Sequence, residues 1–330
     1  MVDIKPGERP TVVIQNGKTA KGSTGSHEKL TARLVVAADG RHSLAQKWTR
    51  VTVERDPERM RISGVIFEGI PIQEATGFAV FNPEIGEAFY LTPQRDGHVR
   101  GWLMYPPQLN LQLHGEEVIS RFLAEAIRVG TPSSWLAQAH AITPVITYCG
   151  DYPRVVHPYK EGVVFIGDCA GCDDPTFGEG MALALRDVRV LRDHLLATQD
   201  WNAAAHAYAK EHDDYFETVR ILGDWYWSLL LETGPEADAR RAKALPLIAQ
   251  DNTRMFDLFG LGPEVPATEA TRQRFFGEEW KWKIVQRTSI SCSDFLTPFS
   301  KAIWRRRKPL WLTTPCCGWP GLFQHLCVGV

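Results

Sequence analysis

Apolar and polar positions alternate in two different ways along this chain. Between Arg61 and Tyr105 the apolar residues fall in short runs that are separated by turn residues such as Pro83, Gly86 and Pro93. This pattern predicts strands over residues 62–67, 77–81, 87–91 and 98–105. Because regularly spaced strands are typical of antiparallel sheets, we expect one antiparallel sheet here.

From Gly178 onward the apolar residues recur at helical spacing. This periodicity predicts helices over residues 180–198, 202–231 and 268–276, and a basic helix bracketed by Pro235 and Pro246. Two shorter helices are expected over residues 116–129 and 132–135. The helix over residues 180–198 carries one set of apolar residues on one face: Met181, Leu185, Val188, Leu191 and Leu195.

The N-terminal part predicts strands over residues 11–15 and 32–38, with Asn16-Gly17 as a hairpin turn and a helix that begins near Ser43. Extended runs over residues 145–148 and 155–156 lead into an apolar strand that ends at Asp168. Strands and helices therefore share this part of the chain, which favours an α/β arrangement.

Residues 162–180 are the most informative segment, because they predict a strand, a loop and a helix in succession. An acid at the carboxyl end of a strand, here Asp168, is typical of ligand sites in open α/β sheets. Gly178 and Gly180 allow close approach of a ligand to the backbone, and Pro175 fixes the path of the loop. The helix that follows directs its positive end to the same place.

This segment resembles the Gly-Asp motif of class A FAD-dependent monooxygenases, the aromatic hydroxylases of the para-hydroxybenzoate hydroxylase type. The family pattern is Gly-Asp-Ala-Ala-His, then Pro, then Gly-Gln-Gly. The chain keeps six of its positions: Gly167, Asp168, Ala170, Pro175, Gly178 and Gly180. It departs at Cys169, at Gly171, where histidine is common, and at Glu179, which replaces glutamine and adds a negative charge.

The resemblance implies that FAD is the cofactor and that NADH or NADPH reduces it. It places Asp168 on the ribityl chain and Gly178, Glu179 and Gly180 against the flavin. Gly167 and Pro175 are also among the residues that the resemblance assigns to cofactor binding. The negative charge of Glu179 would disfavour an anionic reduced flavin.

A second motif, Asp39-Gly40-Arg41-His42-Ser43, follows the predicted strand over residues 32–38. It resembles the Asp-Gly motif of the same family, which lies upstream of the Gly-Asp motif with a β-rich substrate domain between them. The resemblance implies that Asp39, Gly40 and Arg41 face the pyrophosphate side of the cofactor. Gln46 stands at the position where the family has arginine, with Lys47 beside it.

A third family element, the glycine fingerprint GxGxxG, is not present in the 330 residues. Gly22-Ser23-Thr24-Gly25 is too short and has neither a strand before it nor a helix after it. The resemblance covers about residues 10–279. We therefore expect the C-terminal two-thirds of such an enzyme, with a partner chain as one possible source of the lobe that carries the fingerprint.

The expected fold class is α/β (α+β), with a truncated Rossmann-like FAD-binding domain, an antiparallel β-sheet substrate domain and a helical C-terminal region. We place the partial FAD-binding domain at residues 1–50 and 141–200 and the substrate domain at 51–140. The helical region then spans residues 201–279, and an atypical tail spans 280–330.

Composition narrows the class of protein. The chain is 44% hydrophobic and 23% charged with a net charge of -2, so its charge gives no basis for nucleic-acid binding. No apolar run reaches the roughly 18 residues of a membrane-spanning helix, and the N-terminus lacks a signal-peptide core. We expect a cytoplasmic protein without stable membrane insertion.

The seven cysteines are odd in number and irregularly spaced, which favours reduced thiols. Cys169 and Cys172 form a CxxC without a second pair or a histidine at zinc-like spacing, so no metal site is predicted.

Other chemistry-bearing residues have a structural and a functional interpretation. Four aromatic residues could line a substrate pocket, but alternating aromatic residues on strands are more often core: Phe81, Phe89, Trp102 and Tyr105. His98 and His157 could act as acid or base, although a single histidine is more often structural. The basic run at residues 304–308 could touch an anionic membrane surface, and a disordered or out-of-frame extension is the alternative.

These observations favour an FAD-dependent monooxygenase that uses NAD(P)H and oxygen on a small aromatic or apolar organic substrate. No residue is assigned to catalysis. A catalytically inactive remnant or binding module is one alternative, since the glycine fingerprint is absent. A flavin-dependent halogenase or reductase of the same fold is another.

Overall fold

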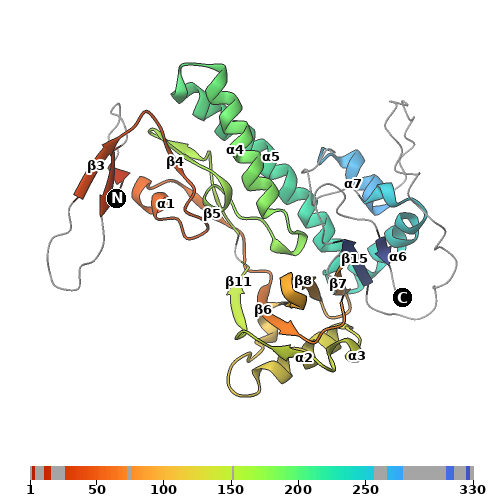
Figure 1. Ribbon diagram of the computed structural model, residues 1–330. Coiled ribbons are helices and arrows are strands. Elements are labelled where there is room, and N and C mark those ends of the chain that lie inside the picture. The colour runs from red at the N-terminus through yellow and green to blue at the C-terminus, as the bar shows by residue number, and fades with distance from the viewer. Residues whose placement is uncertain are drawn as a thin grey trace, which may run out of the picture. The chain divides into compact units, whose positions relative to one another are not determined.

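The computed structural model describes residues 2–3, 11–15, 27–72, 76–150, 152–255, 266–277, 310–315 and 325–327 (Figure 1). It divides into two compact units. Unit 1 comprises residues 1–61, 149–224 and 257–264, and unit 2 comprises residues 62–148, 225–256 and 265–330. The four-part division expected from the sequence stays a prediction.

Unit 1 contains a small sheet whose central strand is fully buried. Strand β14 (Val163–Phe165) pairs in parallel with β4 (Val35–Ala37) and antiparallel with β13 (Tyr159–Lys160). Strand β4 lies at the edge of this sheet. Because β14 is covered on both faces, it is a continuous apolar run, as strands of parallel sheets usually are.

Further elements of unit 1 surround that sheet. Its helical segments are α1 (Leu44–Thr49), η3 (Gly167–Cys169), η4 (Pro175–Phe177) and α4 (Gly180–Ala197), and α5 (Trp201–Leu230) begins in this unit. Short strands pair as β5 (Val53–Arg55) with β12 (Pro153–Val155), and as β1 (Val2–Asp3) with β2 (Thr11–Gln15) and β3 (His27–Thr31). The predicted turn at Asn16-Gly17 lies outside the described residues.

Unit 2 is built on the predicted antiparallel sheet. Its main strands are β6 (Arg61–Glu68), β7 (Thr76–Asn82), β8 (Glu87–Pro93) and β9 (Val99–Tyr105), in the spatial order β6-β9-β8-β7. The shorter strands are β10 (His140–Ala141), β11 (Ile146–Cys149), β15 (Leu310–Pro315) and β16 (His325–Cys327). The expectation of one antiparallel sheet here is confirmed.

Helices α2 (Val118–Val129) and α3 (Ser133–Leu136) cover the core of this sheet. Phe122 and Ala126 of α2 are fully buried with Phe89 and Tyr105 of the strands. Phe81 is also buried, so these three strand aromatics are core residues. Trp102 is half-buried.

The apolar face of α4 that the sequence indicates is largely exposed. Leu191 is buried, but Met181, Leu185 and Val188 are 75%, 57% and 50% exposed. The buried side of the helix instead carries Leu183, Asp187, Val190 and Leu191. The reason is that α4 packs small and polar side chains against the loop that follows β14. The spacing of apolar residues in the sequence does not reveal such a buried face.

Helix α6 (Pro235–Gln250) contains Pro246, where the sequence predicted a boundary. A proline inside a helix removes one backbone hydrogen bond and costs about 3 kcal/mol. Ala244 and Ile248 are buried on either side of Pro246, and this burial offsets the cost of continuing the helix. Helix α7 (Glu269–Phe276) begins after the capping residue Thr268, as predicted.

No helix within the described ranges is both long enough and apolar enough to cross a membrane.

Candidate functional site

The loop after β14 presents one carboxylate to solvent. Strand β14 ends at Phe165, and Gly167 then adopts a left-handed conformation with φ 61°. Asp168 follows in the first turn of η3 and is exposed. Its carboxyl group makes no hydrogen bond with any residue that the structure describes. Asp168 therefore offers a free acceptor at the carboxyl end of a strand, where the sequence predicted it.

Helix α4 fixes this turn from behind. The Gly167 N–H donates to Oδ2 of Asp187 across 2.8 Å, and Asp187 is only 4% exposed. Burial raises the pKa of Asp187, while His212, whose Nε2 lies 3.9 Å from Oδ2, and the Gly167 N–H oppose the shift. A Cβ at Gly167 would lie 3.3 Å from the Ala184 Cβ, so the helix contacts the turn directly.

The second half of the loop leads to the N-terminus of α4. Oδ1 of Asp174 accepts from the Thr176 N–H at 2.9 Å, and Pro175 begins η4. Gly178 is left-handed, with φ 75°, which favours glycine. The N-cap residue Glu179 makes no side-chain capping hydrogen bond to the first turn of α4.

The residues present fit a flavin nucleotide at this place. A Cβ added to Gly180 would meet only Oδ1 of Asp168, at 4.0 Å, so there is room for a ligand against the backbone. An exposed carboxylate, an open glycine and a helix N-terminus without a cap from its own N-cap side chain suit a hydroxyl-bearing chain with an adjacent anionic group. FAD has both.

Asp39 accepts hydrogen bonds from the first residues of α1. Its Oδ2 accepts from the N–H groups of Leu44 and Ala45 at 2.7 and 3.0 Å, and its Oδ1 accepts from Ser43 Oγ at 2.6 Å. Burial opposes the ionisation of Asp39, but these hydrogen bonds and one from Cys169 outweigh burial and lower its pKa. Asp39 thus holds the N-terminus of α1, and its predicted place beside the pyrophosphate stays a prediction.

The neighbours of Asp39 in the motif lie at the same turn. Gly40 is left-handed, with φ 76°, and a Cβ there would meet nothing within 4 Å. Arg41 donates from Nη2 to the backbone oxygen of Cys149 at 2.7 Å. Pairing of Arg41 with a phosphate stays a prediction.

Hydrogen bonds join the two motifs to each other. Sγ of Cys169 donates toward Oδ1 of Asp39 at 3.1 Å and Oγ of Ser43 at 3.2 Å. The buried side chain of Gln46 donates from Nε2 to the Cys169 oxygen at 2.8 Å. Cys169 and Gln46, two departures from the family pattern, therefore form the link. The sequence marked both departures but gave no sign that they meet.

The third departure, Gly171, is explained by its neighbour on α5. A Cβ at Gly171 would lie 2.7 Å from Cζ of Phe216, closer than real Cβ contacts. Phe216 stacks on His212, with the ring centroids 5.4 Å apart and the planes 13° apart. This aromatic packing leaves no room for the histidine that the family often has at this position.

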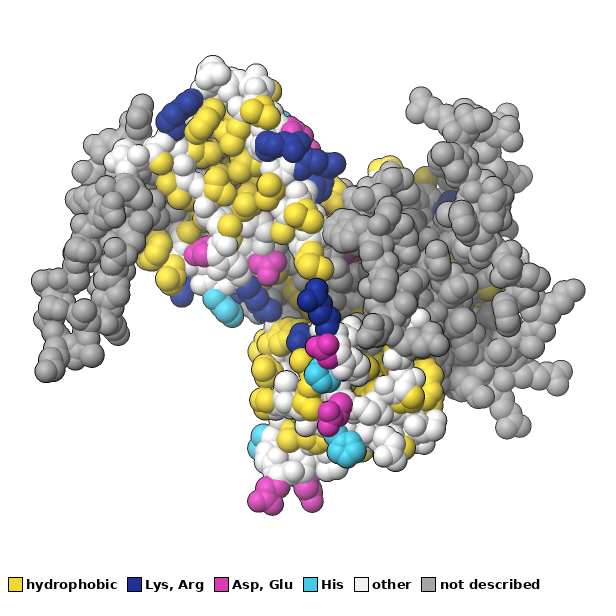
Figure 2. All heavy atoms as spheres, in the orientation of Figure 1, with side chains coloured by type: hydrophobic (Ala, Val, Ile, Leu, Met, Phe, Trp, Pro, Cys, Tyr) yellow, Lys and Arg dark blue, Asp and Glu magenta, His cyan; other side chains and the backbone are white. Residues whose placement is uncertain are grey.

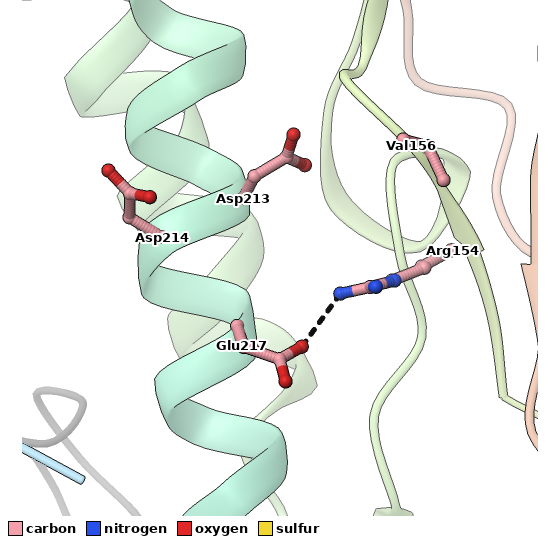
Figure 3. Close-up of a pocket in the computed structure, with 5 residues that line it drawn as sticks. All are labelled: Arg154, Val156, Asp213, Asp214 and Glu217. Carbon is pink, nitrogen blue, oxygen red and sulfur yellow. Dashed lines mark hydrogen bonds and ion pairs between the residues drawn. The ribbon is translucent and has the colours of Figure 1, made fainter. Parts of the chain in front are cut away.

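A cavity of about 350 Å³ lies elsewhere in unit 1, between the β12 strand and α5 (Figure 3). Its lining residues are Arg154, Val156, Asp213, Asp214 and Glu217. Arg154 reaches across to Glu217 at 2.8 Å, and Asp214 pairs with Lys210 at 2.6 Å. Asp213 accepts from the His157 N–H at 3.1 Å, so each charged group of the lining has a partner. None of the predicted site residues lines this cavity.

The two histidines considered from the sequence contact residues outside the loop. His157 is left-handed, with φ 54°, and its Nε2 lies 2.8 Å from Nδ1 of His206. His98 closes a turn, its backbone oxygen accepting from the Gln94 N–H at 2.7 Å. Among the described residues, no group of three His, Cys, Asp or Glu side chains could hold a metal ion. Residues 22–25 and 304–308 lie outside the described part.

Comparison with solved structures identifies the fold. The chain matches a flavin-dependent halogenase, CmlS, with a TM-score of 0.56 and 15% identity over 89% of this chain and 46% of that one. It matches the anhydrotetracycline hydroxylase OxyS from Streptomyces rimosus with a TM-score of 0.57 and 13% identity, over 87% and 52%. A flavin-dependent brominase matches with a TM-score of 0.55 and 15% identity, over 69% and 58%.

The chain thus spans roughly half to three-fifths of the length of these three structures. No curated protein matches it. A family model described as an FAD binding domain matches residues 12–215, which is more than half of the chain and includes both motifs. In agreement with the resemblance of those motifs to class A FAD-dependent monooxygenases, the chain belongs to the family of FAD binding domains.

Proposed function

We propose that this chain is the flavin-side part of an FAD-dependent monooxygenase that takes electrons from NADH or NADPH and acts on a small aromatic or apolar substrate. The observation that supports this most is the exposed Asp168 carboxylate beside the open backbone of Gly180. Both lie at the N-terminus of α4, within the matched domain.

In this proposal each residue binds rather than reacts. Asp168 accepts hydrogen bonds from the ribityl hydroxyls, and Gly178 and Gly180 let the backbone approach the ring and the phosphates. The N-terminus of α4 stabilises negative charge there. FAD, when bound, supplies the electron transfer and the activation of oxygen, and the protein orients it.

The substrate is proposed to lie over the sheet of unit 2. The half-buried Trp102 and Tyr148 contact edge to face, with ring centroids 6.4 Å apart, and the side chain of Arg100 lies 5.1 Å from the Trp102 ring. These residues offer an aromatic surface with one positive charge. The fully buried Phe81, Phe89 and Tyr105 are core residues and take no part.

We further propose that a partner segment supplies the glycine-rich lobe that the 330 residues lack. Met181, Leu185 and Val188, at i, i+4 and i+7 of α4, are exposed, and so is Val36 on the edge strand β4. Hydrophobic side chains gather over the region of β4 and α4 (Figure 2). Parallel sheets are normally covered on both faces, so these features suit a strand and helix added beside β4.

An inactive remnant or binding module is favoured by a different observation, the lack of GxGxxG in the chain. An enzyme and a binding module differ in whether flavin binding is followed by turnover. An enzyme oxidises NADH or NADPH in the presence of substrate and oxygen once the glycine-rich lobe is supplied. A binding module holds flavin without turnover. Product analysis with and without bromide or chloride separates hydroxylation from halogenation.

The binding step is tested first, on the whole chain. We expect a purified chain that is colourless or binds FAD weakly, and a yellow preparation with stoichiometric FAD would show that no partner lobe is needed. Titration with FMN and riboflavin, followed by flavin fluorescence, isolates the ribityl contact, and ADP serves as the ligand without a ribityl chain.

Asp168→Ala should weaken FMN binding about tenfold, the effect of one or two lost charge-assisted hydrogen bonds. Asp193→Ala is the matched control, because Asp193 is an exposed aspartate on α4 that pairs with its neighbour Arg192. Equal FMN affinity in the wild type and the Asp168→Ala variant would refute the assignment.

A further inference from the structure

The last carbonyl group of β14, that of Phe165, lacks a backbone donor on the β13 side of the sheet. In the antiparallel pairing of β13 with β14, Tyr159 lies opposite Val164. The next pair in this register is Pro158 and Phe165, and the Phe165 N–H donates to the Pro158 oxygen at 2.9 Å. Such a pair normally exchanges two hydrogen bonds, but proline has no N–H with which to return the second.

Tyr208 of α5 supplies the missing donor. Its Oη donates to the Phe165 oxygen across 2.8 Å, and both side chains are fully buried. Burial, reinforced by the negative charge of Asp187, raises the pKa of Tyr208, so the hydroxyl keeps the proton that it donates. Because a buried carbonyl without a donor is costly, the proline at position 158 and the tyrosine at position 208 complement each other.

The same peptide group is also held at its other edge. The Ile166 N–H lies in one plane with the Phe165 carbonyl, and it donates to the Ala37 oxygen of β4 at 3.0 Å. Tyr208 and Ala37 thus fix this peptide plane from opposite sides. Loss of either contact would let the plane tilt about the hydrogen bond that remains.

The next peptide group extends the anchored segment to Asp168. Its N–H, that of Gly167, donates to Asp187 of α4 at 2.8 Å. Three hydrogen bonds, to α5, β4 and α4, therefore fix two consecutive peptide planes. Asp168 directly follows them, so the direction of its exposed carboxylate depends on this anchored segment.

We propose that Tyr208 is a positioning residue for flavin binding, which directs the Asp168 carboxylate toward the ribityl chain through the Phe165 carbonyl. The inference rests on the proposed function, because it takes Asp168 as the ribityl acceptor. Tyr208 is buried and acts on the backbone of β14 rather than on the flavin.

A purely structural role is the competing explanation, since the Tyr208 ring belongs to a buried core cluster with Val164 and Ala205. Substitution by phenylalanine keeps the ring and removes only the hydroxyl. Tyr208→Phe should weaken FMN binding about fivefold, the effect of one lost hydrogen bond to a buried group. Tyr215→Phe is the matched control on α5, because the Tyr215 hydroxyl makes no hydrogen bond to the residues that the structure describes. It should bind FMN as the wild type does.

A double-mutant cycle with Asp168→Ala separates positioning from structure. If Tyr208 acts through Asp168, removal of its hydroxyl has little left to change once the carboxylate is gone. The FMN affinities of Asp168→Ala and of Asp168→Ala/Tyr208→Phe, measured on full chains by flavin fluorescence, should therefore agree. A loss by the same factor in both backgrounds would overturn the proposal, because the hydroxyl would then affect binding independently of Asp168.

Pro158 offers a rescue that is specific to the Phe165 carbonyl. Pro158→Ala restores a backbone N–H opposite this carbonyl, which can accept from it in place of the lost hydroxyl. The FMN affinity of Tyr208→Phe/Pro158→Ala should return toward the wild-type value, whereas Pro158→Ala alone should change it little. A double variant that binds no better than Tyr208→Phe would contradict a role through this carbonyl.

Amide hydrogen exchange tests the anchored segment without flavin. The Ile166 and Gly167 amides should exchange faster in Tyr208→Phe than in the wild type, because the peptide plane before them has lost one contact. Addition of Pro158→Ala should restore their protection. Unchanged exchange at both amides in Tyr208→Phe would overturn the proposal.

Failure of the proposed function gives a different result. If the wild-type chain binds no FMN, the proposed function and the positioning role are both refuted. If FMN binds and Asp168→Ala weakens it but Tyr208→Phe does not, the ribityl contact stands and only the positioning role is refuted.

Discussion

Gly167 and Asp187, 20 residues apart, are joined by a 2.8 Å hydrogen bond from the glycine N–H to Oδ2 of the aspartate. The bond ties the left-handed turn after β14 to the middle of α4. It places Asp168 without touching it. The helix after the Gly-Asp loop therefore orients the loop, in addition to directing its positive end there.

Removing this contact should harm both stability and binding. Asp187→Ala leaves the Gly167 N–H without its acceptor and should lower the free energy of unfolding by about 1–3 kcal/mol. FMN affinity should fall as well, because Asp168 is no longer held. Asp193→Ala, on the same helix but exposed, is the control and should change neither. Urea unfolding and an FMN titration measure the two effects, and an unaltered Asp187→Ala protein would contradict this role.

The close approach of Gly171 to Phe216 predicts that a larger side chain at position 171 destabilises the protein. Gly171→Ala places a Cβ 2.7 Å from the Phe216 ring, so it should destabilise the protein by about 1–3 kcal/mol. Phe216→Ala alone costs about 3–5 kcal/mol by opening a cavity. The double variant should lose less stability than the sum of the two single losses, because the space left by the Phe216 ring accommodates the new methyl group. Strictly additive losses in thermal unfolding would show that the two positions do not meet.

Glu87 on β8 predicts a pH dependence of unit 2. Glu87 is 1% exposed and pairs with Arg128, but burial, reinforced by Glu125, raises its pKa to about 7. The folded state holds a proton that the unfolded state releases near pH 4.5, so stability should fall as pH rises from about 4.5 to 7. The slope is at most about 1.4 kcal/mol per pH unit for one proton.

Glu87→Gln should flatten that slope, as measured by unfolding at several pH values. Glu84→Gln, in the turn just before β8, serves as the matched exposed control. A wild-type slope that persists in Glu87→Gln would assign the pH dependence to other groups.

The thiols of unit 1 should differ in reactivity. Burial raises the pKa of Cys169 to about 12, so this thiol is not a nucleophile at neutral pH. Cys149 is exposed. Iodoacetamide should label Cys149 first in the native protein, and Cys169 only after denaturation. Peptide mass mapping follows both sites, and fast native labelling of Cys169 would contradict its buried position.

The two faces of α4 can be tested with the same substitution. Leu191 is buried, so Leu191→Glu should lower the free energy of unfolding by several kcal/mol. Leu185 is 57% exposed, so Leu185→Glu should change it by less than about 0.5 kcal/mol in the isolated chain. Comparable destabilisation by both variants, measured in urea, would mean that Leu185 is covered. If the proposed partner segment binds here, Leu185→Glu should instead weaken that binding.

Much of the fold could be predicted from local pattern. Strands β6, β7, β8 and β9 were predicted to within two residues, because short apolar runs between turn residues have few alternative structures. The start of α1 after Ser43 follows from a capping side chain that accepts from the Gln46 N–H.

Other features depend on partners far away in the sequence. The phase of α4 follows from its contact with the loop at Gly167, and a helical period does not say which arc meets a neighbour. Pro246 lies inside α6 because tertiary burial of Ala244 and Ile248 outweighs a local signal.

The same division applies to the site. The sequence by itself determined that an acid and two spaced glycines follow a buried strand, because those residue types and their spacing are local. Only the tertiary structure decided that Asp39 caps a helix and that Cys169 joins the two motifs across 130 positions. Hydrogen bonds of this kind depend on the distance between atoms in space, which spacing along the chain does not fix.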